Sequence, residues 1–217
     1  MSILPDPFLF RIKETLTDWN QFIDAHENPN VRVSVRNNPA KPSHQHENLS
    51  RVPWATSGYY LPERPSFTLD PLLHAGAYYV QEASSMLLEQ AIVQSTDISQ
   101  PQIALDLCAA PGGKSTHLLS LLNSDSLLVS NEVIRSRASI VSETIQKWGN
   151  ENIVVTNNDP EDFQRLSGLF DLIVVDAPCS GEGLFRRDEA AIKEWSQENI
   201  TLCFQRQQRI LSDIWPA

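Results

Sequence analysis

The hydrophobic pattern is most regular from residue 103 onward, where short apolar runs alternate with segments of helical periodicity. This rhythm favours a doubly wound α/β fold with a mostly parallel sheet. The pattern predicts strands at 103–107, 126–131, 152–156 and 170–176. It predicts helices at about 114–122 and 135–148, a short helix near 161–167, and a helix from about 188 to 213.

The first hundred residues show a different pattern. Apolar residues within 1–30 recur at spacings of three and four, which predicts helical structure. Residues 31–36 alternate like a strand, and residues 37–43 have the composition of a loop. Short apolar segments follow at 52–54 and 58–61, and a helix of about a dozen residues is expected to end near Gln94.

These patterns predict three parts: a small α/β N-terminal module at 1–70, a connecting helical segment at 71–100, and an α/β domain at 101–217. The last predicted strand would leave the apolar run Leu172–Val175 unpaired at a sheet edge. Natural sheets avoid such edges. We therefore expect a fold that is truncated after its fourth strand and the helix that follows it.

Composition narrows the class of protein. The chain is 41% hydrophobic and 20% charged over 217 residues, which is ordinary for a globular protein. Apolar runs stay far below the ~18 residues that span a bilayer, and no secretory signal pattern opens the chain. Three widely spaced cysteines fit neither a disulfide framework nor a zinc site. We expect no membrane, no metal and a reducing compartment, the cytoplasm.

The charge distribution is uneven. A net charge of −10 argues against a phosphate-binding protein. However, the segment from Val31 to Arg64 is locally basic, and such an arm on an acidic body could contact RNA. A solvated surface loop is the alternative. The basic residues of this arm are Arg32, Arg36, Lys41, Arg51 and Arg64.

The stretch Ile103–Thr116 ends a strand and opens into a loop of small residues before a helix. Its two glycines, Gly112 and Gly113, allow a ligand to approach closely, and the following helix directs free N–H groups at it. A nucleotide phosphate loop requires glycine where Cys108 stands, so that interpretation fails on spacing. The dinucleotide-binding glycine pattern is absent as well.

Three acidic residues follow successive predicted strands. Glu132 is placed to accept the two hydroxyls of a ribose, and Asp159 could bond an adenine amino group. Asp176 ends the fourth strand. Any one of them could be a helix cap or part of a solvated turn. Together, beside a glycine loop, they predict a site for an adenosyl group.

The loop Asp176–Gly181 brings Cys179 to the carboxyl end of the fourth strand. A lone cysteine is more often a small buried hydrophobe than a reactive group. A nucleophilic thiolate would need a positive neighbour, for which Lys114, Arg186 and Arg187 are candidates. We expect Cys108 to pack at the strand–loop junction and Cys203 in the core of its helix.

These motifs resemble the Nop/Sun family of S-adenosylmethionine-dependent RNA (cytosine-5) methyltransferases, and most closely its bacterial RsmF-like ribosomal RNA enzymes. Cys108–Lys114 resembles the cofactor loop of the family, and Asp176–Gly181 resembles its fourth-strand motif. Gln81–Ser85 is similar to the segment that precedes the methyltransferase core, and Arg206–Gln208 lies in a helix similar to the one after the fourth strand. The resemblance covers roughly residue 30 to the end, and it implies that the module at 1–70 is of RNA-binding type.

The resemblance implies a Rossmann-like class I methyltransferase fold and a set of cofactor contacts. It implies that Glu132 holds the ribose hydroxyls, Asp159 the adenine, and Asp176 the region between cofactor and target base. The methionine and ribose side of S-adenosylmethionine would be lined by Cys108, Ala109, Ala110, Pro111, Gly112, Gly113 and Lys114.

The resemblance also implies a two-cysteine mechanism on ribosomal RNA. Cytosine C5 is a poor nucleophile until a thiolate adds at C6, and a base must later remove the C5 proton so that the covalent adduct collapses. Cys179 matches the release cysteine of the family. The attacking cysteine stands in a Thr-Cys motif that Thr201–Cys203 does not match. The chain alone is therefore expected not to methylate RNA.

Two other functions are compatible with the sequence. A non-catalytic RNA-binding or assembly module could retain the cofactor site as a folding ligand. A small-molecule or protein methyltransferase is a weaker alternative, because the Asp-Pro-Pro-Tyr type of loop used for amine targets is missing after the fourth strand.

Overall fold

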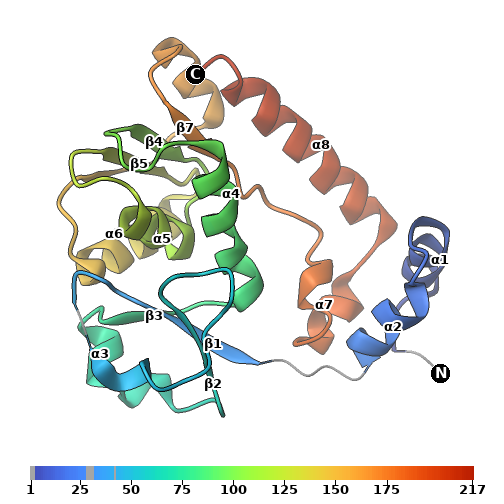
Figure 1. The fold of residues 1–217 in the computed structure, drawn as a ribbon. Coiled ribbons are helices and arrows are strands. Elements are labelled where there is room, and N and C mark those ends of the chain that lie inside the picture. The colour runs from blue at the N-terminus through green and yellow to red at the C-terminus, as the bar shows by residue number, and fades with distance from the viewer. Residues whose placement is uncertain (1–2, 28–31, 42) are drawn as a thin grey trace. The chain divides into compact units, whose positions relative to one another are not determined.

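A computed structural model describes residues 3–27, 32–41 and 43–217 (Figure 1). The chain forms two compact units. One combines Met1–Val31 with Pro178–Ile210, and the other combines Arg32–Ala177 with Leu211–Ala217. The predicted domain boundaries at residues 70 and 100 stay a prediction.

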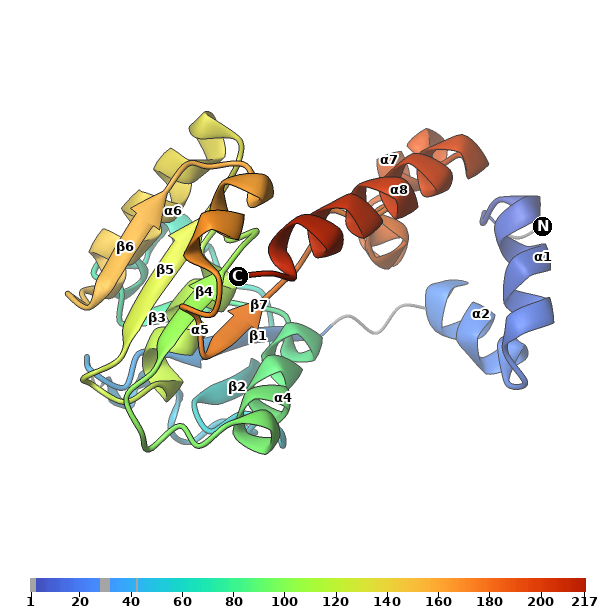
Figure 2. The ribbon, with the colours of Figure 1, turned by 90° about the horizontal axis from the view of Figure 1, so that it is seen from above.

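The larger unit is built around a parallel sheet in the order β6-β5-β4-β7 (Figure 2). Its strands are β4 (Ile103–Asp106), β5 (Leu127–Asn131), β6 (Ile153–Thr156) and β7 (Leu172–Val174). The strands alternate with the helices α5 (Gly113–Leu121) and α6 (Arg135–Trp148) and the 3-10 segment Pro160–Leu166. This arrangement confirms the predicted parallel α/β fold. β7 is shorter than the predicted strand at 170–176.

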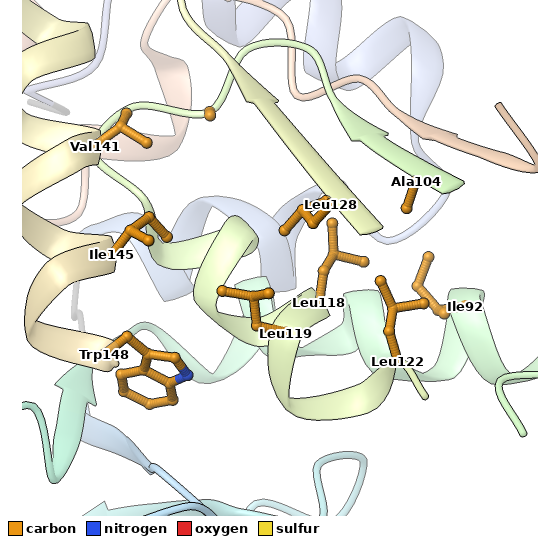
Figure 3. Packing of buried hydrophobic residues seen from close by; sticks show 10 residues of the cluster. Ile92, Ala104, Leu118, Leu119, Leu122, Leu128, Val141, Ile145 and Trp148 are labelled. Carbon is orange, nitrogen blue, oxygen red and sulfur yellow. The ribbon is translucent and has the colours of Figure 1, made fainter. Parts of the chain in front are cut away.

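The core of this unit lies between the sheet and the helices α4 (Leu88–Ser95), α5 and α6 (Figure 3). In α6 the buried residues Val141, Ile145 and Trp148 recur at spacings of four and three, so one stripe of the helix faces the core. Burying each large apolar side chain contributes about 1.5–3 kcal/mol. The buried cluster consists of Ile92, Ala104, Ala109, Leu118, Leu119, Leu122, Leu128, Val141, Ile145 and Trp148.

A small antiparallel sheet in the order β2-β1-β3 belongs to the same unit. It contains β1 (Val33–Asn37), β2 (Gly58–Leu61) and β3 (Tyr78–Val80), with the short helix α3 (Pro71–His74) between β2 and β3. The strand predicted at 31–36 is confirmed from residue 33, and Val31 lies outside the described residues. β3 was not predicted because three residues are too few to show an alternating pattern.

The smaller unit is helical. Its helices are α1 (Asp6–Thr15), α2 (Trp19–Glu27), α7 (Glu189–Glu194) and most of α8 (Gln197–Ile214). The buried core of this unit contains Leu4, Phe8, Ile12 and Phe185. Within the part of the chain that the structure describes, no helix combines the length and the apolar character needed to span a bilayer.

The helix predicted at 188–213 is wrong as a single element, since it is broken between α7 and α8. Trp195 ends α7 in an extended conformation, and its indole Nε1 donates to Glu182 Oε1 at 2.7 Å. Ser196 then accepts a hydrogen bond from Asn199 N at 3.1 Å, which is the contact of a helix N-cap. The helical pattern within 1–30 is likewise interrupted, because Leu16 is extended at the end of α1.

Candidate functional site

In the glycine loop between β4 and α5, neighbouring side chains pack closely against Gly112 and Gly113. Gly112 has a φ of 103°, and a Cβ there would lie 2.8 Å from Thr144 Cγ2. A Cβ on Gly113 would lie 3.0 Å from the Tyr79 ring. Both positions therefore favour glycine because of neighbouring protein groups, and at Gly112 also because of its left-handed backbone.

The backbone of this loop is held from several sides. Arg137 Nη2 donates to Ala110 O at 3.2 Å, and Thr144 Oγ1 donates to Pro111 O at 2.8 Å. Ala109 N donates to Asn131 O at 2.8 Å. These bonds fix the path of the loop before any ligand arrives.

A cavity of about 180 Å³ lies beside the loop. One wall is the predicted cofactor segment. The other is formed by β3 and the segment after it, in which Gln81–Ser85 resembles a family motif. Gly112, Glu132 and Asp159 do not line this cavity. Its lining residues are Tyr79, Val80, Gln81, Glu82, Ser85, Cys108, Ala109, Ala110, Pro111, Gly113, Lys114 and Asp176.

Asp106, which ends β4, is completely buried and was not predicted as a site residue. Its Oδ2 accepts a hydrogen bond from Ser115 Oγ at 2.7 Å, whereas its Oδ1 has no partner among the described residues. Burial raises the pKa of Asp106 to about 6. The available signal in the sequence was an acidic residue at a strand end directly before a glycine loop.

Glu132 lies just beyond the end of β5 and is 3% exposed. Its Oε1 accepts from Ile134 N at 3.1 Å, and its Oε2 lies 3.4 Å from Arg137 Nη1. The carboxylate is therefore fixed in place at the strand end. Its role as the ribose acceptor stays a prediction.

Asp159 caps the 3-10 segment that follows β6. Its side chain accepts from Glu161 N at 3.3 Å, and Asp162 completes a capping box. This is the helix-cap role that is the alternative to cofactor binding for an acidic residue after a strand. Its contact with adenine stays a prediction. Asp176 forms an ion pair with Lys114 Nζ, so both groups meet at the cavity wall.

Cys108 is half-buried in the cavity wall. Burial, together with the negative charges of Glu132, Asp106 and Asp176, raises the pKa of its thiol to about 11. The thiol is therefore protonated at neutral pH and is not suited to nucleophilic attack. Two of these carboxylates lie beside a basic side chain, Asp176 beside Lys114 and Glu132 beside Arg137.

Cys179 is exposed and belongs to the smaller unit, although it follows Asp176 by only three residues. Gln207 Nε2 donates to the preceding Pro178 O at 3.1 Å. A little further along, Glu182 is held by Arg11 Nη2 at 2.6 Å and by Trp195. Cys203 is buried in α8, as predicted.

The prediction of an exposed basic arm between Val31 and Arg64 is wrong for one of its five basic residues. Arg36 is completely buried and does not belong to a surface patch. Lys41 donates to two backbone carbonyls, Ala75 O at 2.9 Å and Lys147 O at 2.6 Å. The arginines of the arm that remain exposed lie over aromatic rings: Arg32 over Tyr60, Arg51 over Tyr59 and Arg64 over Phe67.

Among the described residues, no three His, Cys, Asp or Glu side chains lie together in a group that could hold a metal ion.

The parallel sheet with its alternating helices is the Rossmann-like fold of methyltransferases. The chain belongs to the 16S rRNA methyltransferase RsmB/F family, whose model matches residues 93–217. A model of the N-terminal domain of the 16S rRNA methyltransferase RsmF matches residues 4–83. Membership confirms the predicted family, fold class and cofactor, S-adenosylmethionine.

Individual relatives agree with this assignment. The chain is 35% identical over 213 residues to the ribosomal RNA small subunit methyltransferase F of Aliivibrio fischeri, covering 91% of this chain and 45% of the relative. It is 36% identical over 234 residues to that of Aeromonas salmonicida, covering 100% and 48%. The chain thus spans about half the length of the curated relatives it matches.

Among solved structures, a methyltransferase homolog from Pyrococcus horikoshii is similar, with a TM-score of 0.77 and 28% identity. The match covers 96% of this chain and 68% of that one.

Proposed function

We propose that this chain supplies the cofactor site and the release cysteine of an enzyme that forms 5-methylcytosine in ribosomal RNA. The proposal rests mainly on the glycine loop, whose backbone is fixed by hydrogen bonds from Arg137 and Thr144 and which lines a cavity together with Asp176. Cys179 follows three residues later in sequence, and family membership supplies the ribosomal RNA context.

The residues around the loop fit S-adenosylmethionine, which carries a sulfonium and an ammonium cation. Buried Asp106 has an oxygen without a partner among the described residues, and the carboxylates of Glu132 and Asp176 lie near Cys108. We assign the methionine and ribose side to Cys108–Lys114, the ribose hydroxyls to Glu132 and the adenine to Asp159. The bound cofactor supplies the methyl group.

The proposed chemistry requires two thiols with different tasks. An attacking thiolate adds to cytosine C6, and after methyl transfer a base removes the C5 proton, which lets the C6–S bond break. We assign the second task to Cys179. Cys108 is unsuited to either task because its thiol stays protonated at neutral pH.

The test uses a full-length protein containing this chain, incubated with ribosomal RNA and S-adenosylmethionine. Cys179→Ala should transfer the methyl group and then accumulate a protein–RNA adduct that survives denaturant. Cys203→Ala, which changes a buried thiol of α8, should turn over without an adduct. Normal turnover by Cys179→Ala would contradict the assignment.

A further inference from the structure

Arg36 of β1 is the largest fully buried side chain of the described residues. An arginine has five N–H donors, and Arg36 makes five hydrogen bonds. Its guanidinium carbon also lies 4.7 Å from the centre of the Trp148 ring, the side chain shown at the end of α6 in Figure 3. Among the described residues it forms no ion pair with a carboxylate.

Most partners of Arg36 belong to α5, the helix that begins at the end of the cofactor loop. Nη2 donates to Gly113 O at 3.1 Å and to Thr116 Oγ1 at 2.6 Å. Nη1 donates to Thr116 O and to Ser120 Oγ, each at 3.2 Å. A strand of the small sheet therefore fixes the point where the glycine loop becomes a helix.

The fifth bond reaches the opposite wall of the cavity. Arg36 Nε donates to Gln81 Oε1 at 2.8 Å. Gln81 lines the same cavity as Gly113 and Lys114, which belong to the other wall. One buried side chain thus connects both walls. Burying a guanidinium costs free energy unless its N–H donors are hydrogen-bonded. The two walls are therefore held at the spacing at which all five donors of Arg36 have an acceptor.

Residues that follow β1 also hold α6, but at a place away from the cavity. Asn38 Nδ2 donates to Trp148 O at 2.9 Å, and Lys41 Nζ donates to Lys147 O. These contacts satisfy carbonyls at the last turn of α6, which lack partners within the helix. Neither Asn38 nor Lys41 lines the cavity.

We propose that Arg36 is a positioning residue for the cofactor, which holds the Gly113 turn and the Gln81 wall in their binding geometry. The inference rests on the proposed function, because it assumes that the cavity receives S-adenosylmethionine. A site that already has its bound geometry loses less conformational freedom when the ligand binds. It therefore binds the ligand more tightly than a flexible site with the same contacts. Asn38 and Lys41 stabilise the larger unit but do not determine the positions of the cavity walls.

The experiment compares S-adenosylmethionine affinity, by calorimetry, with the free energy of unfolding for three variants. Arg36→Lys keeps the charge but loses the planar fork of donors, and we expect about tenfold weaker binding. Thr116→Val is isosteric and removes one acceptor of Arg36, and we expect several-fold weaker binding in a protein that stays folded. Lys41→Met should lower the unfolding free energy and leave the affinity unchanged.

Failure of the positioning role of Arg36 can be distinguished from failure of the proposed function. If the unmodified protein does not bind S-adenosylmethionine, the proposed function fails first. If it binds, and folded Arg36→Lys and Thr116→Val bind equally tightly, the positioning role is overturned. If Lys41→Met weakens binding as much as Arg36→Lys, affinity follows general stability and the inference is also wrong. Should Arg36→Lys fail to fold, Thr116→Val decides.

Discussion

The two loops that follow Asp106 and Asp176 begin alike and are built differently. Each leaves the carboxyl end of a parallel strand of the same sheet. The first loop stays within the larger unit, and its carbonyls accept hydrogen bonds from Arg137 and Thr144. The second loop passes into the smaller unit at Pro178 and exposes Cys179.

Cofactor binding and the proposed release step therefore depend on loops that are held by different units. The proposed cofactor loop is fixed by its own unit, so it can be preorganised in this chain. The cysteine loop is anchored by the smaller unit, where Glu182 contacts Arg11 of α1 and Trp195 after α7. The N-terminal helices therefore support the segment next to Cys179, and the two loops should respond to different substitutions.

The largest expected difference comes from one glycine in each loop. Gly112 and Gly181 both have positive φ, but a Cβ on Gly112 would press on Thr144, whereas a Cβ on Gly181 would meet no described atom within 4 Å. Gly112→Ala should lower the unfolding free energy by about 4 kcal/mol, from strain plus overpacking. Gly181→Ala should lower it by about 1 kcal/mol, from strain alone. Urea unfolding measures both, and equal losses would contradict the comparison.

The next effect concerns Asp106 and pH. Burial raises its folded-state pKa to about 6, so in acid the folded protein binds more protons than the unfolded chain. Its contribution to stability is present below pH 4 and is lost as pH rises through about 6, by up to about 3 kcal/mol. Asp106→Asn should remove this slope. Unfolding free energies from pH 4 to 7 that run parallel for both proteins would show that Asp106 does not titrate this way.

A smaller effect is expected at Glu182. Its side chain is 25% exposed and accepts from both Arg11 and Trp195. Glu182→Gln keeps the shape but loses the charge, and should cost about 1 kcal/mol. Hydrogen exchange should accelerate for residues 182–185, while S-adenosylmethionine affinity stays unchanged. Faster exchange in the glycine loop instead would mean that the two loops are not independently held.

The sequence predicted the sheet and much of the proposed site because both depend on local patterns. The helix predicted at 135–148 has the bounds of α6, and the glycine loop lies where its small residues indicated. Arg36 could not be predicted as buried, since its α5 partners stand 77 to 84 residues away in sequence. A run of basic residues reads as a surface feature until tertiary contacts are known.

The break between α7 and α8 illustrates the same limit. The helical periodicity continues through Trp195 and Ser196, so the sequence predicts one helix. The indole hydrogen bond to Glu182 and the capping contact of Ser196 interrupt it. Local propensity is overridden here by a contact made elsewhere in the unit.

The most direct test of the account is calorimetric titration of this chain with S-adenosylmethionine, comparing Glu132→Gln with Glu143→Gln. Glu132 is buried at the end of β5, whereas Glu143 is an exposed residue of α6 that pairs with Lys147. We predict one binding site, an affinity about tenfold lower for Glu132→Gln, and no change for Glu143→Gln. No binding by the folded chain, or equal affinity for the two variants, would contradict the assignment of the glycine loop and Glu132 as the cofactor site.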